Sequence, residues 1–208
     1  MFNVCPACGQ YAEQKTVDPV HVLAVCPFCG HGHPFRRLPL FLLTGASATG
    51  KTAACLRLPE ALPECVALEC DILWRPEFAQ PGEGYRDFRN TWLRVAKNVA
   101  QAGRSVLLSG SSTPSQYEAC PERRYFAESH YLALVCDASV LARRLETRPG
   151  WRECSDAQTI ERMLAFNQWF MESAERTDPP MALLDTTQLT VGDVVRKVVA
   201  WVRSRLWG

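Results

Sequence analysis

The segment from residue 40 to residue 52 constrains the fold more than any other part of the chain. It reads Leu-Phe-Leu-Leu-Thr-Gly-Ala-Ser-Ala-Thr-Gly-Lys-Thr, so an apolar run ends in the pattern G-x-x-x-x-G-K-[ST]. A continuously apolar run of this kind is typical of a strand that is covered on both faces. The residues after Thr52 are compatible with a helix. The sequence therefore predicts a strand, a tight loop and a helix in direct succession.

This loop pattern carries a specific chemistry. Its glycines let the backbone curl so that successive N–H groups point inward at an anion. Lys51 would bring a mobile positive charge to the β- and γ-phosphates of a nucleotide, and Thr52 would offer a hydroxyl to Mg²⁺. A glycine-rich turn without a ligand is the alternative, and the flanking strand and helix patterns favour the phosphate site. We therefore expect ATP and Mg²⁺ to bind through Gly45, Ala46, Ser47, Ala48, Thr49, Gly50, Lys51 and Thr52.

Two C-x₂-C pairs precede the loop. Cys5 and Cys8 form the first pair, and Cys26 and Cys29 form the second. Two intervening residues let both sulfurs of a pair reach one ion, and four thiolates complete a tetrahedral Zn²⁺ shell. Two disulfides or a redox-active pair are the alternatives. The spacing favours a structural zinc site.

The predicted zinc ribbon is too small to bury much apolar surface, so the metal would supply its folding energy. A hairpin is expected between the cysteine pairs, over residues 11–25. His31 and His33 are expected in a solvent-facing turn, because four cysteines already complete the metal shell. Residues 1–37 carry three basic and two acidic side chains, which is no basic patch. A structural role is therefore favoured over nucleic-acid recognition.

Composition is that of an ordinary globular protein. The 208 residues suit a zinc ribbon over 1–37 and one medium domain over 38–208. A net charge of +1 gives no general attraction to nucleic acid or to anionic membranes, and no apolar run approaches the roughly 20 residues that span a bilayer. No signal-peptide pattern precedes the first cysteine pair, and the other six cysteines lie among apolar residues, as expected of reduced thiols. We expect a cytoplasmic protein, and the sequence makes no prediction of its oligomeric state.

Beyond residue 38 the chain alternates between strand-like and helix-like segments. The expected strands are residues 40–44, 66–70, 105–109, 130–136 and 181–185. Apolar residues recur at helical spacing over residues 85–102, 138–147, 156–176 and 191–206. This alternation predicts an α/β fold with a five-stranded, mainly parallel sheet and helices on both faces. A ligand is then expected at the carboxyl ends of the strands, where the loop already lies.

Polar residues follow the second expected strand. Asp71 would face the γ-phosphate, where it could accept a proton from a substrate hydroxyl or hold a Mg²⁺-bound water, or it could be a turn residue. In the next loop, Trp74 could stack on a planar substrate or belong to the core, and Arg75 could clamp an anionic group. Arg86 and Arg89 are expected on a solvated helix face.

An arginine pair follows the fourth expected strand. Arg144 and Arg148 are four residues apart and so share a helix face, and Pro149-Gly150 ends that helix. An arginine-rich helix and turn can close over ATP, neutralise charge in the transition state and exclude water. An ordinary surface helix is the alternative. The hydroxyl groups of residues 109–114 could contact substrate or cap the next helix.

A phosphate loop after strand one, an acidic residue after strand two and an Arg-x-x-x-Arg segment after strand four together resemble the small P-loop kinases. That group includes adenylate, shikimate and gluconate kinases and antibiotic phosphotransferases. The resemblance covers roughly residues 40–206, and it implies that a nucleotide base packs between the lid and residues 185–188. One position departs from the nucleotide-kinase pattern, because Ser109 stands where many members carry an acidic residue before a glycine. The departure favours the small-metabolite or nucleoside branch.

The expected function is transfer of the γ-phosphoryl group of ATP to a small molecule such as a nucleoside, a nucleotide or a sugar-like alcohol. As the resemblance implies, triphosphate and Mg²⁺ would bind at Lys51 and Thr52, the acceptor at Asp71, and the lid would use Arg144 and Arg148. An ATP-regulated protein that grips nucleic acid or a protein through the ribbon is the alternative. The short chain and the near-neutral charge favour the kinase.

Overall fold

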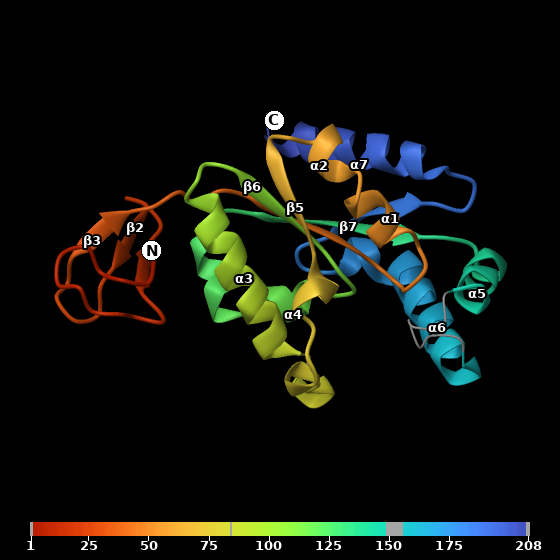
Figure 1. The fold of residues 1–208 in the computed structure, drawn as a ribbon, viewed down its shortest axis with the longest axis horizontal. Coiled ribbons are helices and arrows are strands. Elements are labelled where there is room, and N and C mark those ends of the chain that lie inside the picture. The colour runs from red at the N-terminus through yellow and green to blue at the C-terminus, as the bar shows by residue number, and fades with distance from the viewer. Residues whose placement is uncertain (1, 84, 149–155, 207–208) are drawn as a thin grey trace.

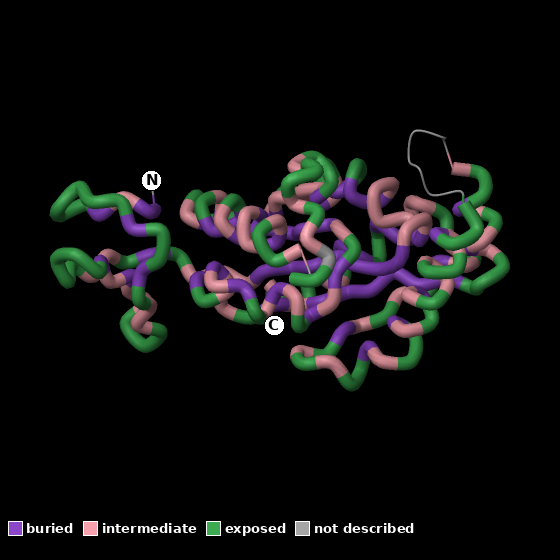
Figure 2. Tube along the Cα trace, turned by 90° about the horizontal axis from the view of Figure 1, so that it is seen from below, coloured by how far each residue is buried: buried purple, intermediate pink, exposed green. Residues whose placement is uncertain are grey.

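The computed structural model describes residues 2–83, 85–148 and 156–206. Within these residues the strands form two sheets, a small antiparallel one near the N-terminus and a larger parallel one (Figure 1). The small sheet lies in residues 2–35, which we term the ribbon. The described residues from 38 onward contain the larger sheet and are termed the body. The ribbon forms a separate lobe beside the body in both views (Figures 1 and 2).

The ribbon contains one strand more than the expected hairpin. Its strands are β1 (Thr16–Asp18), β2 (Leu23–Val25) and β3 (Gly32–Pro34), paired antiparallel in that order. The third strand places His33 opposite Ala24, and the ring of His33 meets the ring of Phe2 at a centroid distance of 5.3 Å. His33 is therefore half-buried, and the prediction of a solvent-facing turn was wrong for it, whereas His31 is exposed.

The larger sheet has the strand order β5-β6-β4-β7-β8, and the pairs that the structure describes are parallel. Its strands are β4 (Leu40–Gly45), β5 (Cys65–Glu69), β6 (Ser105–Ser109), β7 (Ser129–Val135) and β8 (Met181–Asp185). The expected strands are confirmed, and their ends differ from the prediction by a residue at most. The first of them, β4, lies in the middle of the sheet. Later strands add on both sides of it, which opens a crevice at its carboxyl end.

Helices cover both faces of this sheet (Figure 1). One layer consists of α3 (Arg86–Ala100), α4 (Pro114–Glu118) and α6 (Ala157–Ser173), with α5 (Ala138–Glu146) beside α6. The other consists of α1 (Lys51–Cys55), α2 (Leu58–Ala61) and α7 (Val191–Leu206). Alternate residues of β4 serve the two layers: Leu42 packs in the cluster with α3, and Phe41 packs in the cluster with α7. This explains why the strand reads as one apolar run.

Burial is greatest along the three central strands of the body, β6, β4 and β7 (Figure 2). The five described cysteines outside the ribbon are buried thiols, as expected, and Cys154 lies outside the described residues. Among the described helices, none has the length and apolar character to cross a bilayer.

Candidate active site

The phosphate loop joins β4 to α1 and has a backbone shape that its residues dictate. Gly45 has φ 137° and Gly50, the residue before α1, has φ 103°. A side chain at Gly45 would place its Cβ atom 2.3 Å from the carbonyl oxygen of Leu134 on β7, which is impossible without displacing the strand. The first glycine of the pattern is therefore required by the neighbouring strand as well as by the turn.

Lys51 begins α1 and folds back over the loop. Its ammonium group donates to the carbonyl oxygens of Gly45 at 2.7 Å and Ala46 at 2.8 Å. Burial lowers the pKa of Lys51 to about 8, and the nearby Asp71 carboxylate partly offsets this effect. The amine is thus held in place by backbone carbonyls at the mouth of a cavity.

That cavity has a volume of about 400 Å³ and lies at the carboxyl ends of β4, β5 and β6. Segments far apart in the sequence line it together. From the predicted site it includes Ser47, Ala48, Gly50, Lys51, Thr52, Asp71, Trp74, Arg144 and Arg148. Gly45, Ala46 and Thr49 form the back of the loop, where Thr49 Oγ1 donates to the carbonyl of Ala46 at 2.9 Å. A volume of this size suits a small-molecule ligand.

Glu69, the last residue of β5, arranges two of the predicted groups. Its carboxylate accepts a hydrogen bond from Thr52 Oγ1 at 3.2 Å and another from the backbone N–H of Asp71 at 3.1 Å. Carboxylate and hydroxyl oxygens are the ligands that Mg²⁺ prefers. The carboxylate and hydroxyl therefore fit the cation that the loop pattern implies, and Glu69 is a further candidate site residue.

The two predicted arginines, Arg144 on α5 and Arg148 two residues after its end, enter the same region. The Arg144 guanidinium donates to the carbonyl oxygen of Thr186 at 3.1 Å and to its Oγ1 at 3.3 Å, just beyond β8. A second, smaller cleft of about 240 Å³ continues from the loop past Arg144 to Thr186 and to apolar side chains at and before the start of α7. Arg148 lines the main cavity. The Pro149-Gly150 turn and Arg152 lie outside the described residues.

One prediction about the cavity was wrong. Arg89 on α3 is 5% exposed and lines the cavity, whereas a solvated helix face was expected. It donates to Gln116 Oε1 at 2.8 Å and lies over the rings of Tyr85 and Tyr117. The signal was present in the sequence, because Arg89 shares the helix side of the apolar Trp92 and Ala96.

The aromatic wall of the cavity comes from α3 and the preceding loop. Trp74 packs edge-on against Tyr85 and Phe88, with centroid distances of 5.7 and 5.2 Å. Arg75, predicted as a substrate contact, is exposed and is not among the described residues that line the cavity. Cys70 does line it, but burial raises the pKa of its thiol, so the neutral and unreactive form prevails.

The four cysteines of the ribbon converge as their spacing predicts. The Sγ atoms of Cys5, Cys8, Cys26 and Cys29 all lie within 4.8 Å of one another. Two of the separations are 3.7 Å (Cys5 to Cys29) and 3.8 Å (Cys8 to Cys26). A tetrahedral ion with Zn–S bonds of about 2.3 Å requires S···S distances of about 3.8 Å. The cluster therefore fits Zn²⁺ and leaves these residues free of disulfides.

Each cysteine pair is built on the same tight turn. The backbone N–H of Gly9 donates to the carbonyl of Cys5 at 2.9 Å, and Gly30 donates to Cys26 at 3.0 Å. Both glycines have φ 72°, a conformation that glycine adopts without strain. The two pairs are thus a repeated knuckle, in which a glycine follows the second sulfur.

Solved structures similar to this chain include three small-molecule kinases. A sugar kinase from Janibacter sp. HTCC2649 matches with a TM-score of 0.61 and 20% identity, over 82% of this chain and 96% of that one. A gluconokinase from Sinorhizobium meliloti 1021 matches with a TM-score of 0.57 and 22% identity, over 82% of this chain and 95% of that one. Shikimate kinase from Acinetobacter baumannii, in complex with shikimate, matches with a TM-score of 0.55 and 19% identity, over 84% of this chain and 98% of that one.

No protein-family model and no curated protein sequence matches the chain. At identities of 19–22% the likeness to solved structures concerns the fold. That fold agrees with the strand order, with the glycine-rich loop after β4 and with the cavity at the strand ends. The chain therefore has the fold of the small P-loop kinases, preceded by a ribbon whose four cysteines can hold zinc.

Proposed function

We propose that this protein is an ATP-dependent kinase that transfers the γ-phosphoryl group to a hydroxyl of a small molecule, such as a nucleoside, a nucleotide or a sugar-like alcohol. One observation carries the proposal. A single cavity brings together the phosphate loop, a carboxylate after β5 and arginines from two different helices. Phosphoryl transfer needs little more than positioning and charge neutralisation, and these groups supply both.

The nucleotide side of the cavity is the phosphate loop and α5. Lys51 and the loop amides would bind the β- and γ-phosphates, and Arg144 and Arg148 would neutralise charge that develops during transfer. The smaller cleft between Gly50 and Thr186 is the place where a nucleotide base would lie. Its apolar side chains at Leu189, Val191 and Val194 suit a planar ring.

Thr52 and Glu69 would hold Mg²⁺. Their oxygen atoms are already joined by a hydrogen bond at 3.2 Å, on the side of the loop that faces the cavity. When bound, the cation would neutralise phosphate oxygens and orient the triphosphate.

The acceptor side is Asp71 and α3. Asp71 would take the proton of the attacking hydroxyl as the new O–P bond forms and the bond to the leaving ADP breaks. Trp74, Tyr85 and Phe88 offer flat apolar surfaces for the acceptor. The buried guanidinium of Arg89 favours acceptors that also carry a carboxylate or a phosphate.

An ATP-consumption screen tests the proposal. The purified protein is assayed with Mg²⁺-ATP against nucleosides, nucleotides, neutral sugars, sugar acids and sugar phosphates, and products are identified by mass spectrometry. The expected result is one acceptor class that gains a phosphoryl group, with the product absent for Lys51→Ala and strongly reduced for Asp71→Asn. Full turnover by Asp71→Asn would contradict the proton-acceptor role.

The same screen separates a kinase from an ATP-regulated binding protein. Short RNA and DNA oligonucleotides are included at two salt concentrations. If ATP turnover responds to an oligonucleotide in a salt-dependent way and to no small molecule, the ribbon-based nucleic-acid function replaces the kinase proposal.

A further inference from the structure

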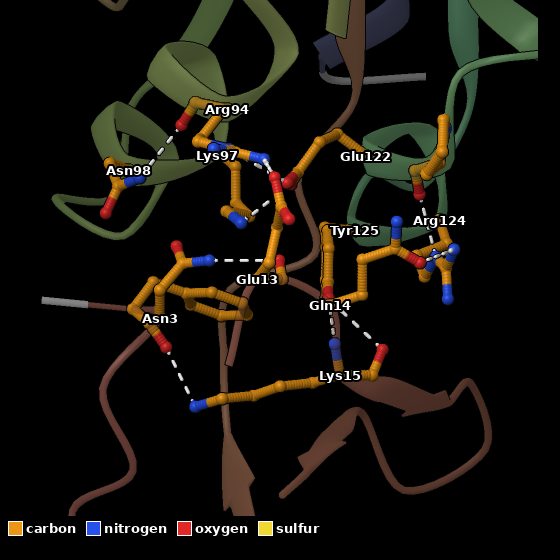
Figure 3. Close-up of polar contacts among 12 residues, drawn as sticks. Asn3, Glu13, Gln14, Lys15, Arg94, Lys97, Asn98, Glu122, Arg124 and Tyr125 are labelled. Carbon is orange, nitrogen blue, oxygen red and sulfur yellow. Dashed lines mark hydrogen bonds and ion pairs between the residues drawn. The ribbon is translucent and has the colours of Figure 1, made fainter. Parts of the chain in front are cut away.

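Helix α3 has two different ends. Its first turn contributes Phe88 and Arg89 to the cavity, and Tyr85, the residue before the helix, lines the cavity as well. Its later turns carry Arg94 and Lys97, which face the ribbon (Figure 3). The helix has 15 residues and therefore spans about 22 Å. One rigid element thus connects the proposed acceptor site to the ribbon.

The centre of the contact between ribbon and body is buried. The ammonium of Lys97 lies 4.7 Å from the centroid of the Phe2 ring and 4.5 Å from that of Tyr125. It also donates to Glu122 at 2.6 Å, and Lys97 and Glu122 are each 1% exposed. Phe2 belongs to the ribbon, whereas the other three residues belong to the body. A side chain of the ribbon therefore seals a charged pair of the body from water.

Further hydrogen bonds join the ribbon to the body at several points. The backbone N–H of Lys15 donates to the Tyr125 hydroxyl at 2.7 Å, and that hydroxyl donates back to the Lys15 carbonyl at 3.1 Å (Figure 3). Glu13 accepts from Arg94 on α3 at 2.6 Å. The backbone of Arg36, just after the ribbon, exchanges two bonds with the Gln101 side chain at the end of α3.

The contacts continue along α3 toward the cavity. Glu122 lies in the 3₁₀ helix η4 (Pro121–Tyr125), and its carboxylate also accepts from Arg94 at 3.2 Å. The backbone N–H of the same residue donates to Asn90 Oδ1 at 3.1 Å. Asn90 is the immediate neighbour of Arg89. The bonds that hold the ribbon thus reach the residue beside the cavity arginine.

The contact surface belongs to the same small unit as the four-cysteine site. Phe2, Glu13 and Lys15 all lie in the segment that carries the first cysteine knuckle, and the buried Lys15 ammonium donates to the carbonyl of Phe2 at 2.9 Å. The apolar cluster of the ribbon includes Phe2, Ala24 and Phe35, and its remaining buried member, Tyr125, belongs to the body. So few apolar contacts cannot hold the segment in place without the four-sulfur site.

We propose that the ribbon is a metal-dependent support for α3, so that zinc in the ribbon sets the affinity for the acceptor while nucleotide binding is unaffected. The phosphate loop lies on β4 and α1 and has no part in the ribbon contact. Trp92, whose indole donates to the carbonyl of Cys70 at 3.1 Å, keeps α3 on the sheet when the ribbon leaves. The acceptor part of this inference rests on the proposed kinase function, whereas the docking part does not.

The four lysines of the chain provide a test of docking that needs no activity assay. Lys15 and Lys97 are buried at the contact, Lys51 lies in the phosphate loop, and Lys197 is exposed on α7. The whole protein is treated with acetic anhydride before and after zinc chelation, and acetylation of each lysine is measured by mass spectrometry. Zinc content is followed in the same samples.

Chelation is expected to expose Lys15 and Lys97 to acetylation and to leave Lys51 and Lys197 at their initial levels, and added Zn²⁺ should restore protection. Continued protection of Lys97 in zinc-free protein would overturn the proposal. A parallel rise at Lys51 would also overturn it, because the whole protein and not the ribbon alone would then depend on the metal.

The effect on the acceptor site is tested with two phenylalanine variants. Phe2→Ala removes the ring that covers Lys97, and Phe28→Ala removes a ring that is 63% exposed on the second knuckle. With the acceptor found in the screen, Phe2→Ala is expected to raise the acceptor KM at least about fivefold, the lower end of typical coupling between sites. The Kd for Mg²⁺-ATP and all constants of Phe28→Ala should match wild type. An unchanged acceptor KM in Phe2→Ala would refute the coupling.

If no acceptor is found, amide hydrogen exchange replaces the kinetic measurement. Exchange over the first turn of α3 should increase in Phe2→Ala and in zinc-free protein, with exchange over α1 unchanged. Equal protection of α3 in every sample would refute the support role, whether or not the protein is a kinase.

Discussion

Lys97 under the ribbon and Lys51 in the cavity are both withdrawn from solvent, and their partners differ. Lys97 donates to a carboxylate, that of Glu122, at 2.6 Å. Lys51 donates to two backbone carbonyls of its own loop, at 2.7 and 2.8 Å. A carboxylate cancels the charge of a buried ammonium, whereas carbonyls satisfy its hydrogen bonds and leave its charge available. The Lys97–Glu122 pair therefore suits a closed interface, whereas the bonding of Lys51 suits reversible binding of an anion.

The largest expected effect comes from breaking the closed pair. Glu122→Gln leaves the buried Lys97 and its neighbour Arg94 facing a neutral amide, and the free energy of unfolding should fall by about 3–5 kcal/mol. Urea denaturation measures this. The double variant Lys97→Met/Glu122→Leu is the control, because it removes both charges and should recover much of the loss. A Glu122→Gln protein as stable as wild type would show that the pair is unimportant.

In the cavity the same kind of substitution should act on activity and spare stability. Lys51→Met removes a cation whose hydrogen bonds, among the described residues, go to backbone carbonyls. The acceptor kcat/KM should fall on the order of 100- to 1,000-fold, or about 2.7–4 kcal/mol. The midpoint of urea unfolding should not fall. Lys197→Met, at an exposed position of α7, is the matched control. A Lys51→Met enzyme that keeps its activity but unfolds more readily would reverse the assigned roles of the two lysines.

A pH series tests whether the Lys51 charge is available. Its pKa is lowered to about 8 by burial, so the amine is protonated below that pH and neutral above it. Bound triphosphate favours the protonated form. Above pH 8 the protein must therefore take up a proton to bind ATP, and affinity should fall by up to about tenfold per pH unit, or about 1.4 kcal/mol.

Calorimetric titration of Mg²⁺-ATP between pH 6.5 and 9.5 measures this change. Lys51→Arg is the control, because a guanidinium stays charged over the whole range and should flatten the profile. A wild-type affinity that is constant up to pH 9.5 would mean that the ammonium does not bind the phosphates.

The smallest effect is expected at a cation that belongs to neither region. Arg75 is exposed and stands apart from the described lining of the cavity, so Arg75→Ala should change the acceptor kcat/KM by no more than about twofold, or 0.5 kcal/mol. Arg89→Ala, at the buried arginine, should raise the acceptor KM far more. Equal kinetic losses in the two variants would show that the loop before α3 folds over the acceptor.

Local patterns predicted the parts of this protein that are built from neighbouring residues. The strand, loop and helix at residues 40–55 follow from one stretch of sequence. The cysteine spacing likewise predicted a four-sulfur cluster, since two short turns are enough to form it.

What the sequence missed depends on contacts between distant segments. Arg89 lies on the helix side that periodicity marks as buried, but its partners Gln116 and Tyr117 are more than 25 residues away and could not be read from the pattern. The pair of Lys97 with Glu122 spans a similar separation. Periodicity places a residue on a side of a helix, but it does not reveal which element covers that side. The third ribbon strand was missed for the same reason, because only pairing with β2 makes residues 32–34 a strand.

The contact between Gly45 and β7 has a consequence for the affinity of the proposed nucleotide site. Because the Leu134 carbonyl leaves no room for a side chain at Gly45, packing against the sheet fixes the backbone of the phosphate loop. Little chain entropy then remains to be lost when a triphosphate arrives. On the proposed function, the nucleotide side of the cavity would therefore be preformed, and adjustment to the acceptor would fall to α3 and the ribbon.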